Sequence, residues 1–438
     1  MRLGLSIERA PHPAAPLRFL LTAPWLGVLA AVALLWGGPD ALASRWTAAV
    51  LAATHLLTLG FMAHAMLGAL LQLLPVVAGV PVPRTNAVAV VTYPALLLGT
   101  LTLAAAFLAG VQQLFAVAMA LLAFAFGPYL LAVAIGFARR RLLEDPARVI
   151  GIAMLALLVT VSLGLVLASG LAGLPLPLLE LTRLHAAWGI LGWTLLLVLG
   201  AGLAVVPMFQ MTAAYPPWLH GGFAVALLAL LSAWSVSAWW QWEVAALILQ
   251  WCLAAAAAVV ALTTLGLQQR GRRRREPDAT FLHWRLGMLC LLAAIGTWAF
   301  SEVMRLEAAQ PVALLLGVLL LPGFALSVIA GMLYKIVPFL LWLALQMRVS
   351  GKPPQVREIL PEASGNLQLW MHMVAVALLA AAATVWSGLI YPAALALAAS
   401  SAMLGVNLAQ AALFARAFAA RSQPLPPGPG RSKWKSIA

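Results

Sequence analysis

The chain has 438 residues, of which 64% are hydrophobic and only 9% are charged, and its mean hydropathy is +1.01. Soluble domains carry about 25% charged residues, so this composition excludes a soluble globular protein. The net charge of +14 does not indicate nucleic-acid binding, because the basic residues lie in short segments between apolar runs. Cys252 and Cys290 both lie inside such runs, which excludes a disulfide framework and a cysteine-rich metal site.

Apolar runs long enough to cross a bilayer recur along the whole chain. The first run follows a polar N-terminus, but it is too long and begins too far into the chain for a cleaved signal peptide. We therefore predict an all-α membrane protein with twelve transmembrane helices, at residues 17–37, 44–79, 87–110, 113–138, 148–171, 183–210, 217–240, 243–268, 281–304, 311–346, 367–389 and 391–420.

Residues 1–423 are predicted to form a single polytopic transmembrane domain. Residues 424–438 are rich in proline, glycine and basic residues, and we expect a disordered basic tail near anionic lipid headgroups.

The basic residues predict the orientation of the chain. Twelve helices place both termini on one side of the membrane. Of the 26 Lys and Arg, only Arg45, Arg183 and Arg305 fall on the opposite side and Lys335 falls inside a helix, which leaves 22 on the terminal side. This bias predicts a multi-pass protein of a bacterial inner membrane with both termini in the cytoplasm. Tryptophans near helix ends are expected to anchor the bilayer interfaces, namely Trp36, Trp46, Trp218, Trp239, Trp240, Trp284 and Trp370.

A glycine–proline pattern, Gly-x7-Gly-x6-Pro, occurs three times at spacings of 132 and 131 residues. It predicts three repeats of four helices, at about 17–138, 148–268 and 281–420, around a pseudo-threefold axis. Glycines permit a close helix neighbour, and the proline bends the helix end. Coincidence among glycine-rich helices is the alternative, and the equal spacing argues against it. The pattern falls on helices 2, 6 and 10, at Gly60, Gly68 and Pro75, at Gly192, Gly200 and Pro207, and at Gly323, Gly331 and Pro338.

Ionisable side chains inside spanning helices are candidate functional residues because they are costly to bury. His55, His64, His185, His372 and Lys335 meet this description. Lys335 has an alternative interpretation, in which its ammonium group reaches the nearby cytoplasmic surface. The remaining histidines lie in the tail or at the cytoplasmic edge, where we expect them to be solvated, namely His12, His220 and His283.

His55 and His185 form the leading candidate pair. They precede the first glycine of their repeats by five and seven residues, so they are expected within about 3 Å of one depth. Two imidazoles from neighbouring inner helices at one depth are what a six-coordinate haem requires. His64 is nine residues from His55 and faces the opposite side of an ideal helix, so it is a candidate for a second metal centre or a polar cavity. For each histidine, His372 included, the alternative is a hydrogen-bonded core residue.

The architecture resembles subunit I of the haem-copper oxidases, and the closer resemblance is to the NnrS family of haem- and copper-binding membrane proteins linked to nitric oxide stress and denitrification. The resemblance is carried by THLLTLGFMAHAMLGALLQLLPVVAGVPVPR at residues 54–84, by RLHAAWGILGW from Arg183 and by GMLYKIVPFLLW from Gly331. Where that family has His-x-x-His-Glu, leucines and a threonine follow His55 here. Helix 10 has no histidine, and helix 7 offers only His220. The full ligand set of an oxidase is therefore lacking.

These observations predict a protein without oxidase activity that binds one haem b through His55 and His185. The resemblance implies copper as a further metal, a role in nitric oxide stress, denitrification or respiration, and other respiratory or denitrification membrane proteins as partners in the lipid bilayer. Two alternatives stay open. One is a transporter of a small solute or metal ion, and the other is a non-catalytic subunit or assembly factor of a respiratory complex. The sequence has no phosphate-binding glycine loop, HExxH, nucleophile elbow or CxxC motif.

Overall fold

The computed structural model describes residues 11–270, 277–306, 310–350 and 352–423, and this part of the chain is helical without β-strands. Twelve helices are long and apolar enough to cross a membrane, and each coincides with one predicted apolar run. The chain is therefore a multi-pass membrane protein with twelve candidate spans, as predicted. The tail at 424–438 and the basic run at 272–275 lie outside the described residues.

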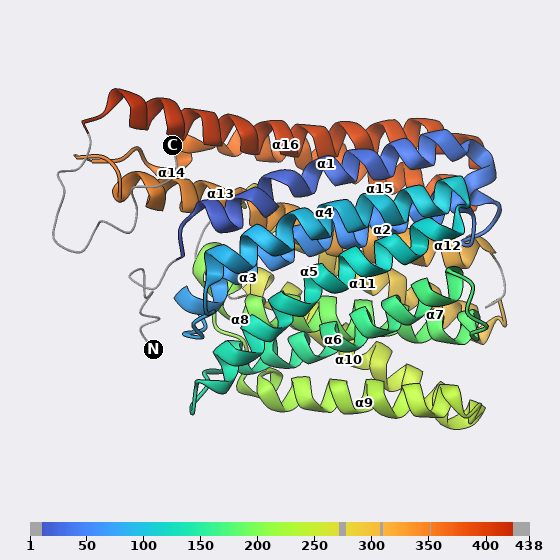
Figure 1. Cartoon of the computed structure of the whole chain (residues 1–438). Coiled ribbons are helices and arrows are strands. Elements are labelled where there is room, and N and C mark those ends of the chain that lie inside the picture. Colours follow the sequence, from blue (N-terminus) through green and yellow to red (C-terminus); the bar gives the residue numbers. More distant parts are fainter. Residues whose placement is uncertain (1–10, 271–276, 307–309, 351, 424–438) are drawn as a thin grey trace.

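We group the spans into three consecutive quartets (Figure 1). The second member of each quartet is a composite helix, which we call its inner helix. The first quartet is α1 (Ala14–Gly37), α2–η3–α3 (Ala48–His55, Leu56–Ala63, His64–Val76), α4 (Thr85–Ala109) and α5 (Gln112–Ala138). The second is α6 (Asp145–Leu171), α7–η4–α8 (Leu178–Ala187, Trp188–Leu195, Leu196–Gln210), α9 (Gly221–Trp239) and α10 (Glu243–Arg270). The third is α11 (Ala279–Val303), α12–η6–α13 (Gln310–Val318, Leu319–Leu326, Ser327–Gln346), α15 (Glu362–Thr384) and α16 (Ile390–Arg421).

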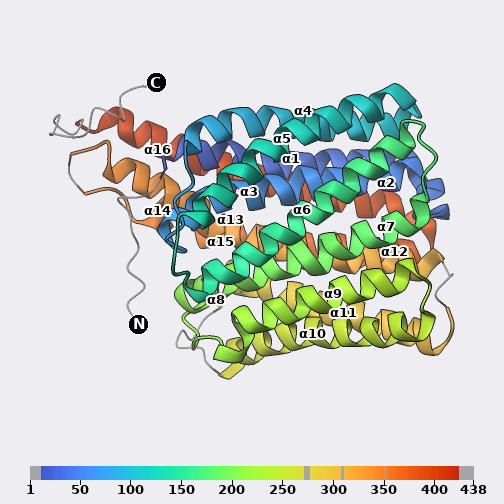
Figure 2. The same cartoon turned by 60° about the horizontal axis from the view of Figure 1, so that its bottom comes forward.

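Four short helices connect the spans, namely η2 (Gly38–Ala43), η5 (Pro217–Leu219), α14 (Val356–Ile359) and η7 (Ser387–Leu389). Figures 1 and 2 show that α1 begins, and α16 ends, at the same end of the bundle as α14. We call this the terminal end and the opposite one the far end.

The inner helices form the core. In the most apolar stretches of the first and second inner helices, 78% and 72% of residues are buried, against 56% in the third inner helix and in the span that contains α1, and 22% in α10. The peripheral helices instead expose large apolar side chains such as Phe124 and Leu131, as expected for surfaces that contact lipid.

Each inner helix contains an eight-residue π-helical segment at an equivalent place. The segments begin at Leu56, Trp188 and Leu319, which are separated by the same 132 and 131 residues as the glycine–proline pattern. The first glycine of the pattern is the fifth residue of every segment and precedes a buried aromatic residue, namely Phe61, Trp193 or Phe324. A π-helical turn contains more residues than an α-helical turn, and its backbone hydrogen bonds join residues five apart instead of four. The backbone carbonyls therefore accept from different N–H groups than in an α-helix.

The second glycine of the pattern lies against the first helix of its own quartet. A side chain does not fit at any of these three contacts. A Cβ atom would lie 2.6 Å from Phe19 Cβ at Gly68, 2.9 Å from Ile150 Cγ1 at Gly200, and 2.7 Å from His283 Cβ at Gly331. The glycines therefore allow the close helix approach that the sequence predicts.

The quartets also contact one another in an ordered way. The last helix of each quartet packs against the first helix of the next, α5 on α6 and α10 on α11, and α16 returns to α1. Figure 1 shows α16 lying along α1, while Figure 2 shows α9, α10 and α11 at one edge of the bundle. The spans thus close into a ring around the inner helices.

One predicted interface anchor is wrong. Trp284 is only 2% exposed, whereas Trp36 is 85% exposed and Trp370 is 63% exposed. Its indole ring lies against Gly202 of α8, where a Cβ would come within 3.3 Å of the ring. Contact between neighbouring quartets, which a hydropathy pattern does not reveal, buries this residue.

Candidate functional site

His55 ends α2, immediately before the π-helical segment η3. Its Nδ1 lies 2.8 Å from the carbonyl oxygen of Leu51, and its ring stacks on Phe107 of α4 with 5.1 Å between centroids. Because a carbonyl only accepts, Nδ1 carries the proton and donates this hydrogen bond. The other ring nitrogen, Nε2, keeps a free lone pair.

His185 lies in α7, on the neighbouring quartet. Its Nδ1 donates to the carbonyl oxygen of Thr160 at 3.0 Å. Gly164 makes room for the ring, since a Cβ there would lie 3.0 Å from the Cε1 atom of His185. This imidazole therefore also presents Nε2 as a lone pair.

His55 and His185 lie in the inner helices of neighbouring quartets, and both are partly buried. Neither Nε2 has a hydrogen-bond partner within the described part of the chain. Metal-bound histidines typically donate one ring nitrogen to a carbonyl and coordinate through the other. Each imidazole therefore has one ring nitrogen held by a carbonyl and the other free to accept a hydrogen bond or to coordinate.

Within the ranges that the structure describes, no group of three or more His, Cys, Asp or Glu side chains lies close enough together to bind one metal ion. A copper centre with three histidines, which the oxidase resemblance would require, is thus not formed by these residues.

His64 is completely buried at the start of α3. Its Nδ1 donates to the carbonyl oxygen of Leu59 at 2.9 Å, and its ring meets those of Phe19 and Tyr93 at about 6 Å. Its buried Nε2 has no partner among the described atoms. The prediction that His55 and His64 face opposite sides of the helix assumed an ideal α-helix. The residues between them are π-helical, so the angle of an ideal α-helix does not apply here.

His283 is not solvated, contrary to the prediction. It is fully buried in the third quartet, where its Nε2 lies 2.9 Å from the side-chain oxygen of Gln368. The amide nitrogen of Gln368 donates to Ser400 Oγ at 3.0 Å, so the amide oxygen accepts from His283. The sequence places the first turn of α11 at the membrane edge, but α13 and α15 cover it.

His372 lies beside His283, with 5.9 Å between ring centroids. Its Nε2 donates to the carbonyl oxygen of Pro322 at 3.0 Å and lies 3.1 Å from Ser327 Oγ. These contacts make His372 a member of a buried polar network in the third quartet, which we define as His283, Ser327, Gln368, His372 and Ser400.

Sequence reasoning missed most of this network. Gln368 and His372 are four residues apart and therefore share one face of α15, while Ser400 and Asn407, seven apart, share a face of α16. Asn407 donates to the hydroxyl group of Tyr334 at 2.9 Å. Polar residues recurring at helical spacing within apolar runs were the available signal.

Lys335 forms an ion pair, with Nζ 2.8 Å from a carboxylate oxygen of Asp278. Asp278 also accepts from the backbone N–H of Phe281 and so caps α11. The pair lies in a pocket of about 190 Å³ at the terminal end, lined also by Tyr334 and Arg357.

The two remaining histidines lie outside the candidate spans at the terminal end. His220 is partly exposed and contacts Asp145 at 2.8 Å, which agrees with the expected edge position. Partial burial, together with the nearby Arg348 and Arg18, lowers the pKa of His12 from its usual 6.5.

Comparisons with known protein families and with curated proteins give no match to this chain.

Proposed function

We propose that this chain is a haem-binding protein of a bacterial inner membrane and that His55 and His185 are its axial ligands. The observation that carries the proposal is that two imidazoles in the inner helices of neighbouring quartets are each held through Nδ1 by a carbonyl and keep Nε2 free. A planar haem placed between helices takes one imidazole nitrogen on each face. The two free Nε2 atoms fit that requirement.

We further propose that the quartets are three repeats around a pseudo-threefold axis, in the manner of oxidase subunit I. Three observations support this architecture, namely the equally spaced π-helical segments, the glycine contacts with the first helix of each quartet, and the closed ring of helices. The excess of Lys and Arg at the terminal end supports cytoplasmic termini.

The residues around the pair would orient it and exclude water. The carbonyls of Leu51 and Thr160 fix each ring tautomer, and Phe107 provides an apolar wall beside His55. A bound haem would supply a one-electron redox couple. Two protein ligands leave no open coordination position, which favours electron transfer or haem storage in nitric oxide stress, denitrification or respiration, with other membrane proteins of those systems as partners. Copper held by the same two imidazoles is the alternative metal.

The absorption spectrum of the purified protein, expressed with added haem precursor, tests this proposal. We expect a Soret band and low-spin visible bands, both lost or shifted in His55→Ala and His185→Ala. His220→Ala is the matched control and should leave the spectrum unchanged, since His220 contacts Asp145 outside the spans. A protein without a Soret band, or a band that survives both substitutions, would overturn the ligand assignment.

One observation favours a second candidate, a transporter driven by a proton gradient. The pocket at Lys335 is lined by Tyr334, whose ring stacks on His283 with 6.3 Å between centroids, and the polar network continues to His372. Ionisable chains of this kind mark proton paths in membranes. Solute flux into proteoliposomes that is lost in His283→Leu and kept in His55→Ala would favour transport over haem binding.

A further inference from the structure

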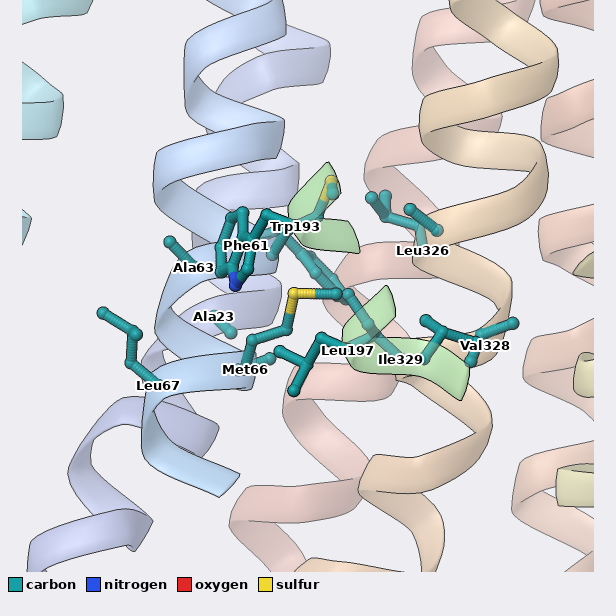
Figure 3. Close-up of a cluster of buried hydrophobic side chains, with 14 of the residues drawn as sticks. Ala23, Phe61, Ala63, Met66, Leu67, Trp193, Leu197, Leu326, Val328 and Ile329 are labelled. Atoms are coloured by element: carbon teal, nitrogen blue, oxygen red, sulfur yellow. The ribbon is translucent and has the colours of Figure 1, made fainter. Parts of the chain in front are cut away.

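The three inner helices, together with Leu20 of α1 and Trp284 of α11, line a partly open cavity of about 150 Å³. Side chains from all three helices line it, and Figure 3 shows Met66, Leu197 and Ile329 converging there. The lining is apolar apart from the amide of Gln72 of α3 and the indole N–H of Trp284 of α11, and it contains no charged side chain. The cavity is separate from the His55–His185 pair, which lies toward the far end.

Gln72 is 7% exposed, and neither its amide nitrogen nor its amide oxygen has a hydrogen-bond partner in the described structure. A buried amide without partners is destabilising, because it has lost its bonds to water and gained none. At the equivalent position of the third inner helix, Lys335 forms an ion pair with Asp278. Gln72 instead lines the cavity, where no protein group pairs with it.

The size and chemistry of the cavity restrict its occupant. An apolar cavity of about 150 Å³ holds a molecule the size of benzene, and ordered water needs two to four polar partners, which walls that are almost wholly apolar do not supply. A charged ligand is excluded because no counter-charge lines the walls. The amide offers one donor group and one acceptor to an oxygen atom on the ring.

We propose that this cavity binds a neutral six-membered ring carrying a hydroxyl or carbonyl oxygen, of the phenol or quinone type, with Gln72 hydrogen-bonded to that oxygen. The apolar walls from Met66, Leu197 and Ile329 enclose the ring. The lining extends to Val77 and Phe339 near the terminal ends of the first and third inner helices, so the ring is expected to enter from that end.

Fluorine NMR of two probes tests the site. Protein in lipid nanodiscs is titrated with 4-fluorophenol or with fluorobenzene, which lacks the hydroxyl group, and empty nanodiscs correct for partition into lipid. We expect 4-fluorophenol to bind, and its affinity to fall about tenfold in Gln72→Leu, the loss expected for one or two hydrogen bonds. Fluorobenzene should bind Gln72→Leu at least as well as the unaltered protein.

Two further variants complete the test. Ala201→Phe fills the cavity and should abolish binding of both probes, whereas Gln346→Leu, an exposed glutamine on α13, should change neither. Thermal melting shows that each variant is folded, and Gln72→Leu is expected to be stable because it removes an unpaired amide. Equal binding of 4-fluorophenol to Gln72→Leu, unchanged binding to Ala201→Phe, or no binding to the unaltered protein would overturn the proposal.

Discussion

Two buried histidines pair with carbonyls at the same position of two π-helical segments. His64 donates to Leu59, the fourth residue of η3, and His372 donates to Pro322, the fourth residue of η6. A π-helical turn shifts the backbone hydrogen bonds and leaves carbonyls for other donors. The segments therefore explain how polar side chains are accommodated in the apolar core without charged partners.

The polar network of the third quartet predicts a stability effect at Gln368. Gln368→Leu removes an acceptor from His283 and a donor to Ser400, which leaves buried polar atoms unpaired. We expect a loss of about 1–3 kcal/mol in unfolding free energy, measured by denaturation in mixed micelles. Gln346→Leu is the exposed control and should stay within about 0.5 kcal/mol. Equal stability of the two variants would show that the network does not hold the quartet together.

The glycine contacts predict opposite outcomes for two substitutions in one inner helix. In Gly331→Ala the new Cβ meets His283 Cβ at 2.7 Å and Thr280 O at 3.2 Å, so α11 and α13 must separate. Overpacking of this kind costs about 1–3 kcal/mol. Gly317→Ala places a Cβ in open space and should be neutral or stabilise the helix by up to about 1 kcal/mol. Melting temperatures of the two variants, compared with the unaltered protein, decide between these outcomes.

The surroundings of a single residue were predicted correctly where its position along a helix decides them. They were predicted wrongly where contacts between distant helices decide them. His220 lies outside the candidate spans and contacts Asp145, as its place in the chain predicts, whereas the ligand role of His55 and His185 stays a prediction. His283 was predicted to be solvated and Trp284 to anchor the interface, yet contacts with α13, α15 and α8 bury both. No feature of the local sequence records those neighbours.

At the scale of elements, hydropathy located the spans but not their internal geometry. The helix predicted from residue 44 begins at Ala48, because Thr47 caps it by accepting from the N–H of Val50. The π-helical segments are apolar, like the α-helices around them, so hydropathy does not separate the two. Only the repeated glycine followed by an aromatic residue marks their place in the sequence.

The π-helical segments predict which deletions an inner helix tolerates. A π-helical turn contains one residue more than an α-helical turn, so deleting Thr58 from η3 should restore an α-helix and keep both flanks in register. Deleting Ala69 from α3 instead rotates all following residues by about 100° and removes Leu70 and Leu71 from the core. We expect folded, monodisperse protein from the first deletion and aggregated protein from the second, as judged by size-exclusion chromatography. Aggregation of both would contradict this interpretation.

At the scale of the whole molecule, the orientation is testable by labelling. With Cys252 replaced by alanine, Val111→Cys places a thiol in the far-end loop and Leu142→Cys places one in an exposed terminal-end loop. Intact cells treated with a membrane-impermeant maleimide should label Val111→Cys and not Leu142→Cys. The reverse pattern would place the termini outside the cytoplasm, against the distribution of Lys and Arg.

Because α16 packs along α1, the first and last helices of the chain are neighbours in the structure. The same packing could therefore be reached by a chain whose helices follow a circularly permuted order. Both ends of the described chain reach the same face, and the segment from residue 139 to residue 144 connects α5 to α6 there. A linker joining the present ends, with new ends opened in that segment, would preserve every helix contact. During synthesis, however, the native chain inserts α1 long before α16 is made. The surface of α1 that contacts α16 therefore lacks its protein partner until the last helix is inserted. In a circular permutant that begins at α6, α16 and α1 are synthesised in succession. The time between the insertion of these two helices should therefore be shorter than in the native chain.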